Sequence, residues 1–588
     1  MSSVARMPSG CRVLPAILAL LTTAALVSAP PAVAAWPPDP SINVPLCTTA
    51  FSSQVSAAIP DASGGAIVVW YEDRAGDFDV FARRVNSQGV PLWTNDGNLV
   101  CVQPVISAQI LPKAVSDGAG GAIVVWIDNR NGANALFAQR IDSLGTRLWA
   151  SAGMAVATTS SQVTYFCLAA DGASGAVISW ASQPGLSSDI HAQRLNASGA
   201  MQWGTAGKAL CVNALDQYRP MVVRKSSGIF VVAWEDTRQG FRTDLYAQAL
   251  NAAGTLQWAA NGILVAGSAQ NAINPMLVAT GADDCLLMWD ADSLGTGDVR
   301  GQRLGATGAA LWPGAGLRLF PPGRSGLIGV CADGLGGAYA IVNVLEPSSG
   351  KSPLWVQRIR DTGVLYFAPA GIRVSSILSN QMGAVITRDN GNGCIVAWFD
   401  DQRGLSSNFT PLFDVFAQHI IPGGIHDWYE SGVPVCRAPN QGAGLAISAN
   451  AGTGLGGVVV AWSDTRNSSS PDIYAQGVDS AGRLGFGLLG VDPGAVPATA
   501  SLARPSPNPA PHGATSIAYT LAGREHVQLQ VVDAAGRIVT VLEDGVREPG
   551  QHHVSWDGRV RGHALPPGLY LVQLRTPSRS EIRRLVLL

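Results

Sequence analysis

The sequence predicts an all-β protein: an eight-bladed β-propeller of four-stranded blades, with an N-terminal strand closing the ring, followed by a small β-sandwich. An apolar segment ending in tryptophan recurs along the chain, each copy contains four short strand-like segments, and the N-terminus matches the segment that the last copy lacks. The 588 residues are too many for one ordinary core, and 67 glycines with 36 prolines suit many short strands joined by tight turns.

The recurring segment is Gly-Gly-Ala-Ile-Val-Val-Trp at residues 64–70 and again at 120–126. Looser copies end at Trp180, Trp234, Trp289, Asn343, Trp398 and Trp462, at steps of 54 to 64 residues. Two further markers keep the same spacing: a strand such as Asp-Val-Phe-Ala-Arg-Arg at 79–84, and a later tryptophan such as Trp93. Four strands in a repeat of this length are typical of a propeller blade, whereas the coils of an open β-solenoid, the alternative, are usually much shorter.

The two ends of the repeat array complement each other. The last copy stops at Phe486 without its final strand, while residues 36–47 align with residues 92–101 of the first full copy. We therefore predict that residues 36–47 pair with the strand around 472–478 and remove the exposed edges of an open array. The predicted propeller spans 36–486, and the Gly-, Ala- and Pro-rich residues 487–511 are predicted to be a linker.

The first 34 residues have the layout of a secretory signal peptide: Arg6 and Arg12, an apolar run over 13–27, and the small-residue site Ala-Val-Ala at 32–34. A membrane anchor is the alternative, but an apolar run of 15 residues is shorter than the ~20 that span a bilayer. We expect a protein that is secreted or held on the outer surface of a bacterium, with no transmembrane segment in the mature chain.

Composition and motifs argue against several function classes. The formal net charge of −2 is too weak to attract nucleic acid, and the sequence contains no HExxH, GxSxG, P-loop or CxxC motif. We therefore predict no catalytic residue, no metal site and no cofactor from motifs. The cysteines after the signal peptide fall at repeat-equivalent positions, far apart in a ring, so we interpret most of them as small buried core residues.

Two other residue types have simple structural interpretations. His191 occupies the repeat position of Phe81, which indicates an aromatic replacement within a strand. Aspartates precede the Gly-rich turns and suggest calcium, but the spaced carboxylates of a calcium loop are missing, so we interpret them as turn-forming residues. These aspartates are Asp61, Asp117, Asp171 and Asp333.

A charged motif, Trp-x-Asp-x-Arg, follows the strand tryptophan in several copies. Glu72 and Arg74 fit it with Glu, and Asp400 and Arg403 carry one inserted residue. One interpretation is a carboxylate–guanidinium pair that closes a loop within each blade, and the other is a broken charged ring on one binding face. The candidate binding residues are Asp128, Arg130, Asp236, Arg238, Asp400, Arg403, Asp464 and Arg466.

The pattern changes after the linker, and the C-terminal segments carry a family resemblance. Pro-Asn-Pro at 507–509, Val-Val-Asp-Ala-Ala-Gly-Arg at 531–537, the Trp-Asp-Gly ending of 550–558 and Pro-Gly-Leu-Tyr at 567–570 resemble the Ig-like domain of the flagellar hook-capping protein. The layout is also similar to the type A sorting domains of type IX secretion, although arginines at 583–584 stand where lysine is more usual. The resemblance implies an Ig-like fold for 512–588, and sorting or surface attachment through possible secretion machinery.

The leading hypothesis is a non-catalytic binding or scaffold protein that takes an unknown extracellular protein or glycan. The alternative is an extracellular glycan-active hydrolase or lyase, which would place three or more ionisable residues from different blades at one pocket. The loops after the tryptophan strands vary most in length, so we expect ligand contact on their face, centred on the seventh and eighth blades with Arg403 and Arg466 as polar contacts.

Overall fold

The computed structural model describes residues 36–484 and 501–587 apart from short gaps, the longest at 405–411, 439–443 and 450–456. The described residues form strands and turns without a helix, so no described helix is long and apolar enough to cross a membrane. The chain divides into two compact units, residues 1–488 and 489–588. The predicted signal peptide and most of the predicted linker lie outside the described residues.

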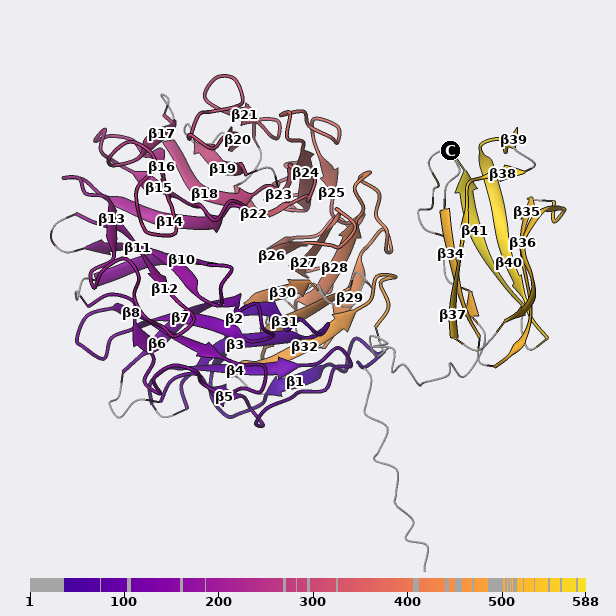
Figure 1. Cartoon of the computed structure of the whole chain (residues 1–588), viewed down its shortest axis with the longest axis horizontal. Coiled ribbons are helices and arrows are strands. Elements are labelled where there is room, and N and C mark those ends of the chain that lie inside the picture. The colour runs from indigo at the N-terminus through magenta and orange to yellow at the C-terminus, as the bar shows by residue number, and fades with distance from the viewer. Residues whose placement is uncertain are drawn as a thin grey trace, which may run out of the picture. The chain divides into compact units, whose positions relative to one another are not determined.

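The first unit is built from four-stranded antiparallel sheets, which we call blades (Figure 1). Blade 1 has the order β2 (Ser53–Pro60), β3 (Ala66–Glu72), β4 (Asp79–Val85), β5 (Asn98–Leu99). Blades 2 to 4 repeat this order in β6 (Gln109–Ser116), β7 (Ala122–Asp128), β8 (Ala135–Ile141), β9 (Met154–Ala155); β10 (Gln162–Ala170), β11 (Ala176–Gln183), β12 (Asp189–Leu195), β13 (Lys208–Cys211); and β14 (Gln217–Arg224), β15 (Phe230–Asp236), β16 (Asp244–Leu250), β17 (Ile263–Ala266).

The same order continues through the second half of the unit. Blades 5 to 7 are β18 (Asn271–Ala279), β19 (Cys285–Asp292), β20 (Asp298–Leu304), β21 (Leu317–Arg318); β22 (Leu327–Ala332), β23 (Ala338–Asn343), β24 (Leu354–Ile359), β25 (Ile372–Arg373); and β26 (Gln381–Arg388), β27 (Cys394–Asp400), β28 (Asp414–Ile420), β29 (Val433–Cys436). The predicted all-β class and repeated four-stranded sheets are confirmed. The first strand of each blade contacts the first strand of the next, so these first strands are the inner strands of the propeller.

The last blade combines the two ends of the repeat array. It has the order β1 (Val44–Cys47), β32 (Asp472–Val478), β31 (Val458–Asp464), β30 (Leu445–Ala449). As predicted, β1 is the fourth strand and pairs antiparallel with β32, with Val44 opposite Ala475. The inner strand β30 of this blade contacts β2 of blade 1.

An aromatic residue between the third and fourth strands of each blade packs against a turn glycine of the following blade. Each of these glycines has φ between +72° and +85°, and a Cβ on it would lie 3.2 Å or less from the aromatic ring. Trp36, which is fully buried, makes this contact from the last blade to blade 1. The pairs are Trp36–Gly89, Trp93–Gly145, Trp149–Gly199, Trp203–Gly254, Trp258–Gly308, Trp312–Gly363, Phe367–Gly424 and Trp428–Gly482.

The tryptophans at these junctions also make a polar contact with the same turn. Each indole Nε1–H donates a hydrogen bond of 3.0 to 3.2 Å to a backbone carbonyl of the next blade. The acceptor for Trp36 is Ser87 O, and that for Trp93 is Ser143 O. The contact therefore combines burial of a large apolar side chain with satisfaction of its one donor, which fixes the indole in a single orientation.

The strand tryptophans form the core inside each blade. Residues 66–70 of β3 are all fully buried, because both faces of the second strand are covered by neighbouring blades. Trp70 stacks on Phe81 of the third strand, with ring centroids 6.1 Å apart. In blade 3, His191 stacks on Trp180 at 5.7 Å in the same way, so its interpretation as an aromatic replacement is confirmed.

The aspartates before the Gly-rich turns organise those turns. Asp61 Oδ1 accepts hydrogen bonds from the backbone N–H groups of Ser63 and Gly65, and its Oδ2 binds Arg84 of the third strand at 2.8 Å. Asp117, Asp171 and Asp333 make the same contacts with their own turns and third-strand arginines. Their interpretation as turn-forming residues is confirmed.

Blade 7 replaces the arginine of this turn with a histidine. His419 lies at the repeat position of Arg84, with Nε2 2.5 Å from Asp389 and Nδ1 3.1 Å from Asp427. Burial alone would lower the pKa of His419, but the hydrogen bonds to Asp389 and Asp427 outweigh it and raise the pKa to about 9.

We predict that blade 7 loses stability as the pH rises through about 9. Because the pKa of His419 is higher in the folded chain than its ordinary 6.5, its contribution is complete below that value and is lost as the imidazolium deprotonates. Thermal unfolding of the wild type and of His419→Arg should be measured from neutral to alkaline pH. The arginine stays charged, so the melting temperature of the wild type should fall more between neutral and alkaline pH than that of the variant. If the two melting temperatures change in parallel with pH, protonated His419 does not stabilise blade 7.

The second unit is a β-sandwich with its own core. One sheet has the order β33 (Ser501–Leu502), β34 (Thr515–Leu521), β37 (Gly550–Trp556), and the other has the order β36 (Ile538–Arg547), β35 (Glu525–Asp533), β40 (Gly568–Arg575), β41 (Ser580–Leu587). A short two-stranded sheet, β38 (Arg559–Val560) and β39 (His563–Ala564), lies between β37 and β40 in the sequence. Alternate residues such as Val527, Leu529 and Val531 are buried, as the sequence pattern predicts for a sandwich.

Candidate functional site

The Trp-x-Asp-x-Arg motif forms a compact polar clasp inside the propeller. In blade 2, Asp128 is fully buried, and its Oδ2 accepts hydrogen bonds from Trp126 Nε1 at 3.0 Å and Arg130 Nη2 at 2.5 Å. The Arg130 guanidinium lies 3.8 Å from the centroid of the Phe137 ring. The arginine is therefore fixed by an ion pair, by a cation–π contact and by a bond to Ala152 O at 2.7 Å.

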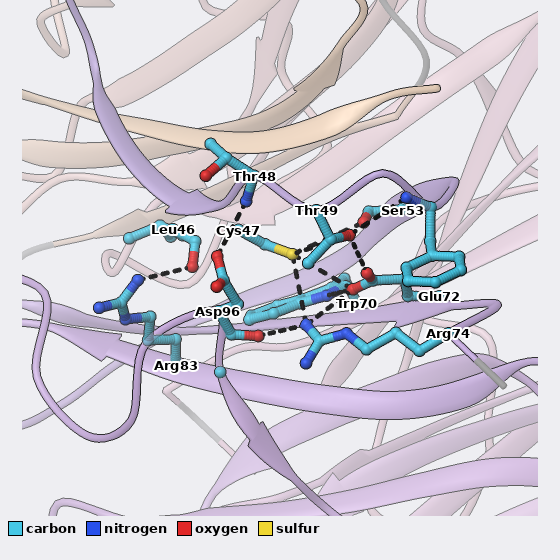
Figure 2. Close-up of polar contacts among 12 residues, drawn as sticks. Leu46, Cys47, Thr48, Thr49, Ser53, Trp70, Glu72, Arg74, Arg83 and Asp96 are labelled. Atoms are coloured by element: carbon cyan, nitrogen blue, oxygen red, sulfur yellow. Dashed lines mark hydrogen bonds and ion pairs between the residues drawn. The ribbon is translucent and has the colours of Figure 1, made fainter. Parts of the chain in front are cut away.

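The same clasp forms in three other blades. Asp236 with Arg238 and Asp464 with Arg466 reproduce it, with each guanidinium against a tyrosine ring. Figure 2 shows the blade 1 version, where Arg74 lies between Glu72 and the sulfur of Cys47. For these pairs the structure shows the loop-closing carboxylate–guanidinium contact that one interpretation expected.

The fifth candidate pair departs from this geometry. Arg403 does not pair with Asp400; its Nη1 binds Asp414 Oδ1 at 3.0 Å and Arg437 O at 2.6 Å. Asp400 instead accepts from Trp398 Nε1 and Ser379 Oγ. The inserted residue lengthens the turn, so the arginine reaches the start of the third strand rather than the end of the second.

The clasps join neighbouring blades through cysteines. Nη2 of each clasp arginine lies 3.0 to 3.4 Å from a cysteine sulfur at the end of the preceding blade. The pairs are Cys47–Arg74, Cys101–Arg130, Cys211–Arg238 and Cys436–Arg466. The equivalent positions at the other junctions hold Ala157, Ala266, Phe320 and Ser375, and there the following blade lacks the unbroken motif.

This coincidence explains the spacing of four of the eight cysteines. Seven of the eight are buried and Cys167 is partly buried, in agreement with their interpretation as core residues. Burial, and then the neighbouring Glu72, raise the pKa of Cys47 to about 12, so it is a neutral thiol that donates to the carboxylate at 3.2 Å.

We predict that Arg466 and Arg403 differ sharply when replaced. Arg466→Ala removes the partner of the fully buried Asp464, and leaving a buried charge unpaired costs about 3 kcal/mol. Asp414, the partner of Arg403, is also buried, but the Arg403 side chain is 32% exposed against 11% for Arg466, and burial already raises the pKa of Asp414. Arg403→Ala should therefore cost less, about 1 kcal/mol. Urea unfolding of both variants checks this, and equal losses would show that Arg466 is not a structural clasp.

A separate feature, a cavity of about 650 Å³, lies among the inner strands of all the blades. None of the eight residues singled out from the charged motif lines it, so their contact with a ligand stays a prediction. Much of its wall is apolar, from residues such as Ile328, Val385 and Ile447. The described wall contains no carboxylate and no histidine, and its ionisable groups come from Lys113, Tyr165 and Arg219 of blades 2, 3 and 4.

The polar groups of the wall follow one another along adjacent inner strands. Lys113 Nζ donates to Phe166 O at 2.8 Å, the Arg219 guanidinium lies 5.6 Å from the Tyr165 ring centroid, and Asn274 follows on the next strand. We call Lys113, Tyr165, Arg219 and Asn274 the polar arc. Half of the Arg219 side chain and nearly half of Tyr165 are exposed, so the arc can contact a ligand.

Two carboxylates lie behind the arc, at the position that follows the strand tryptophan. Glu235 Oε1 accepts the backbone N–H of Asn274 at 2.7 Å, and Asp290 Oδ2 accepts Asn274 Nδ2 at 2.9 Å. Burial raises the pKa of Glu235, and the backbone hydrogen bond from Asn274 opposes this. The carboxylates support the arc from behind, and neither is among the described residues that line the cavity.

Prolines inside the inner strands mark the position of the arc in the sequence. Proline stands inside three inner strands, directly after Leu111, Arg219 and Asn274, and those three residues have φ of +50° to +54°. A proline in a strand interior indicates a bulge, and the strand register shifts at these places. The bulges interrupt the regular alternation of the inner strands where the arc lies.

Comparisons with known proteins address the two units separately. Residues 511–580 match the family model of the FlgD Ig-like domain, which confirms the resemblance to the Ig-like domain of the flagellar hook-capping protein. The similarity to type IX sorting domains stays a prediction. No curated protein sequence matches the chain.

Several solved structures resemble the chain at low identity. A protein of unknown function from Dyadobacter fermentans is 9% identical, over 74% of this chain and 97% of that one, with a TM-score of 0.34. The polysaccharide lyase Uly1 is 10% identical, over 63% of this chain and 90% of its own, with a TM-score of 0.40. An α-L-arabinanase of Penicillium chrysogenum is 13% identical, over 55% and 94%, with a TM-score of 0.32.

Proposed function

We propose that the propeller binds an acidic glycan in its central cavity. The observation that carries this proposal is the charge of the wall: its charged side chains are the cations Lys113 and Arg219, and the described wall contains no carboxylate. A cavity with fixed cations and low-dielectric apolar walls attracts an anion more strongly than its net charge suggests. The exposed Tyr165 ring offers an apolar face on which the C–H face of a sugar can pack.

The purified propeller should bind oligogalacturonates and not neutral galacto-oligosaccharides of the same length in isothermal titration calorimetry. Binding should weaken as salt is added, because the attraction to Lys113 and Arg219 is screened. Acidic peptides should be titrated in the same way, as a second class of anionic ligand. Tight binding of neutral sugars, or of acidic peptides alone, would contradict the proposal.

A second candidate function is cleavage of that glycan by β-elimination. Three ionisable groups from three blades meet at one cavity, which is the arrangement that the enzyme hypothesis requires. Tyr165, as its phenolate, would remove the proton next to the sugar carboxylate while Arg219 stabilises the resulting negative charge. The bond from the adjacent ring carbon to the glycosidic oxygen then breaks, a C=C bond forms, and the Tyr165 phenol returns the proton to the leaving oxygen. Hydrolysis by paired carboxylates has no support in the described wall. Absorbance of an unsaturated product during the binding assay distinguishes cleavage from binding alone.

For the C-terminal unit we propose a role in sorting or attachment at the cell surface. This proposal rests on the match of residues 511–580 to the FlgD Ig-like domain and on the separate core of the unit. A chain truncated after residue 487 should fold, because the propeller has its own core, but should be mislocalised. Fractionation of cells and medium measures this, and normal export of the truncated chain would reduce the unit to a spacer.

A further inference from the structure

The residues around Asn274 depart from the symmetry of the repeats. The position after the strand tryptophan holds Tyr71, Ile127, Ala181, Phe399 and Ser463 in other blades, but Glu235 and Asp290 in the consecutive blades 4 and 5. Residues that serve the fold recur in most blades, as the junction tryptophans do. These two carboxylates, Glu235 buried and Asp290 partly buried, occur only beside the polar arc and therefore have a local task.

That task is to orient the Asn274 amide. Both hydrogens of Nδ2 are directed to acceptors, Asp290 Oδ2 at 2.9 Å and Leu327 O at 2.7 Å, while Glu235 holds the backbone N–H. Because an amide nitrogen donates and an amide oxygen accepts, the two acceptors identify this atom as Nδ2 and the opposite atom as Oδ1. Within the described part of the chain nothing donates to Asn274 Oδ1, so this wall residue offers the cavity an acceptor that requires a hydroxyl or another donor.

Arg219 offers the complementary chemistry. Its Nη1 lies 3.9 Å from Glu235 Oε1, which is too long for a hydrogen bond, so the pair holds the arginine electrostatically without using its donors. A guanidinium presents a planar fork of N–H groups that matches an oxyanion. Its neighbour Tyr165 has an exposed ring and makes no hydrogen bond to the described residues.

We propose that Arg219, Asn274 and Tyr165 form a subsite for one anionic sugar residue of the glycan. The inference rests on the proposed function and narrows it. The sugar carboxylate, or a sulfate ester in the same place, binds Arg219; a neighbouring ring hydroxyl donates to Asn274 Oδ1; and the ring packs beside Tyr165. Glu235 is a positioning residue that acts through Arg219 and Asn274. This combination of one oxyanion and one vicinal hydroxyl donor is the chemistry of a sugar acid.

The test compares Arg219→Gln with Arg224→Gln, which makes the same charge change at the exposed far end of β14. With trigalacturonate as the probe, Arg219→Gln should weaken binding at least about tenfold, because a hydrogen bond to a charged group is lost. Arg224→Gln should bind as the wild type does. A sulfated trisaccharide run in parallel distinguishes the two oxyanions. Failure of the wild type to bind either probe would overturn the proposed function, whereas equal binding by wild type and Arg219→Gln would overturn the subsite alone.

The positioning role of Glu235 has its own readout. Glu235→Gln keeps an oxygen acceptor for the Asn274 N–H but loses the charge that attracts Arg219. It should therefore bind more weakly than the wild type but more tightly than Glu235→Ala, which loses both contacts. Far-ultraviolet circular dichroism and melting temperature confirm that both variants fold. If the two variants bind trigalacturonate equally well, Glu235 does not position the subsite.

Discussion

The propeller depends on one contact, the aromatic side chain of each blade packed against a turn glycine of the next. It occurs at every junction between described blades, and at the junction of the last blade with blade 1 the N-terminal Trp36 makes it. A side chain of this size buries a large apolar area, and its indole donor is satisfied by the same turn. The glycine serves two purposes, since its positive φ suits the turn and its missing Cβ leaves room for the ring.

Repetition of this contact separates structure from function in the chain. Residues that recur, such as the turn aspartates and the clasp arginines, stabilise blades or junctions. Several residues that break the pattern lie at the central cavity, where the polar arc and its two supporting carboxylates occur in blades 2 to 5. The repeated blades can therefore contain an asymmetric site, because side-chain differences on the inner strands do not alter the aromatic–glycine contacts between blades.

Much of the fold could be predicted because the repeat spacing and the strand patterns are local features of the sequence. The pairing of residues 44–47 with the last blade followed from alignment of the two ends. The candidate site could not be found in the same way. From sequence alone, the Trp-x-Asp-x-Arg motif looks like an exposed charged pair. In the structure the indole N–H of the strand tryptophan donates a hydrogen bond to the carboxylate, which is buried. Arg219 and Asn274 reach the cavity through bulges with positive φ, a backbone state that motif searches do not register, although the adjacent prolines indicated it.

The most direct test of the junction contact compares two alanine substitutions in blade 2. Gly145 and Gly132 have nearly the same φ, +85° and +84°, but a Cβ at Gly145 meets Trp93 and Asn98 whereas one at Gly132 meets nothing within 4 Å. Gly132→Ala should lower the free energy of unfolding by about 1–2 kcal/mol from backbone strain alone. Gly145→Ala should lower it by a further ~1–3 kcal/mol because the Trp93 indole and the Asn98 side chain at this junction are displaced. Equal losses in urea unfolding would contradict the central place given to this contact.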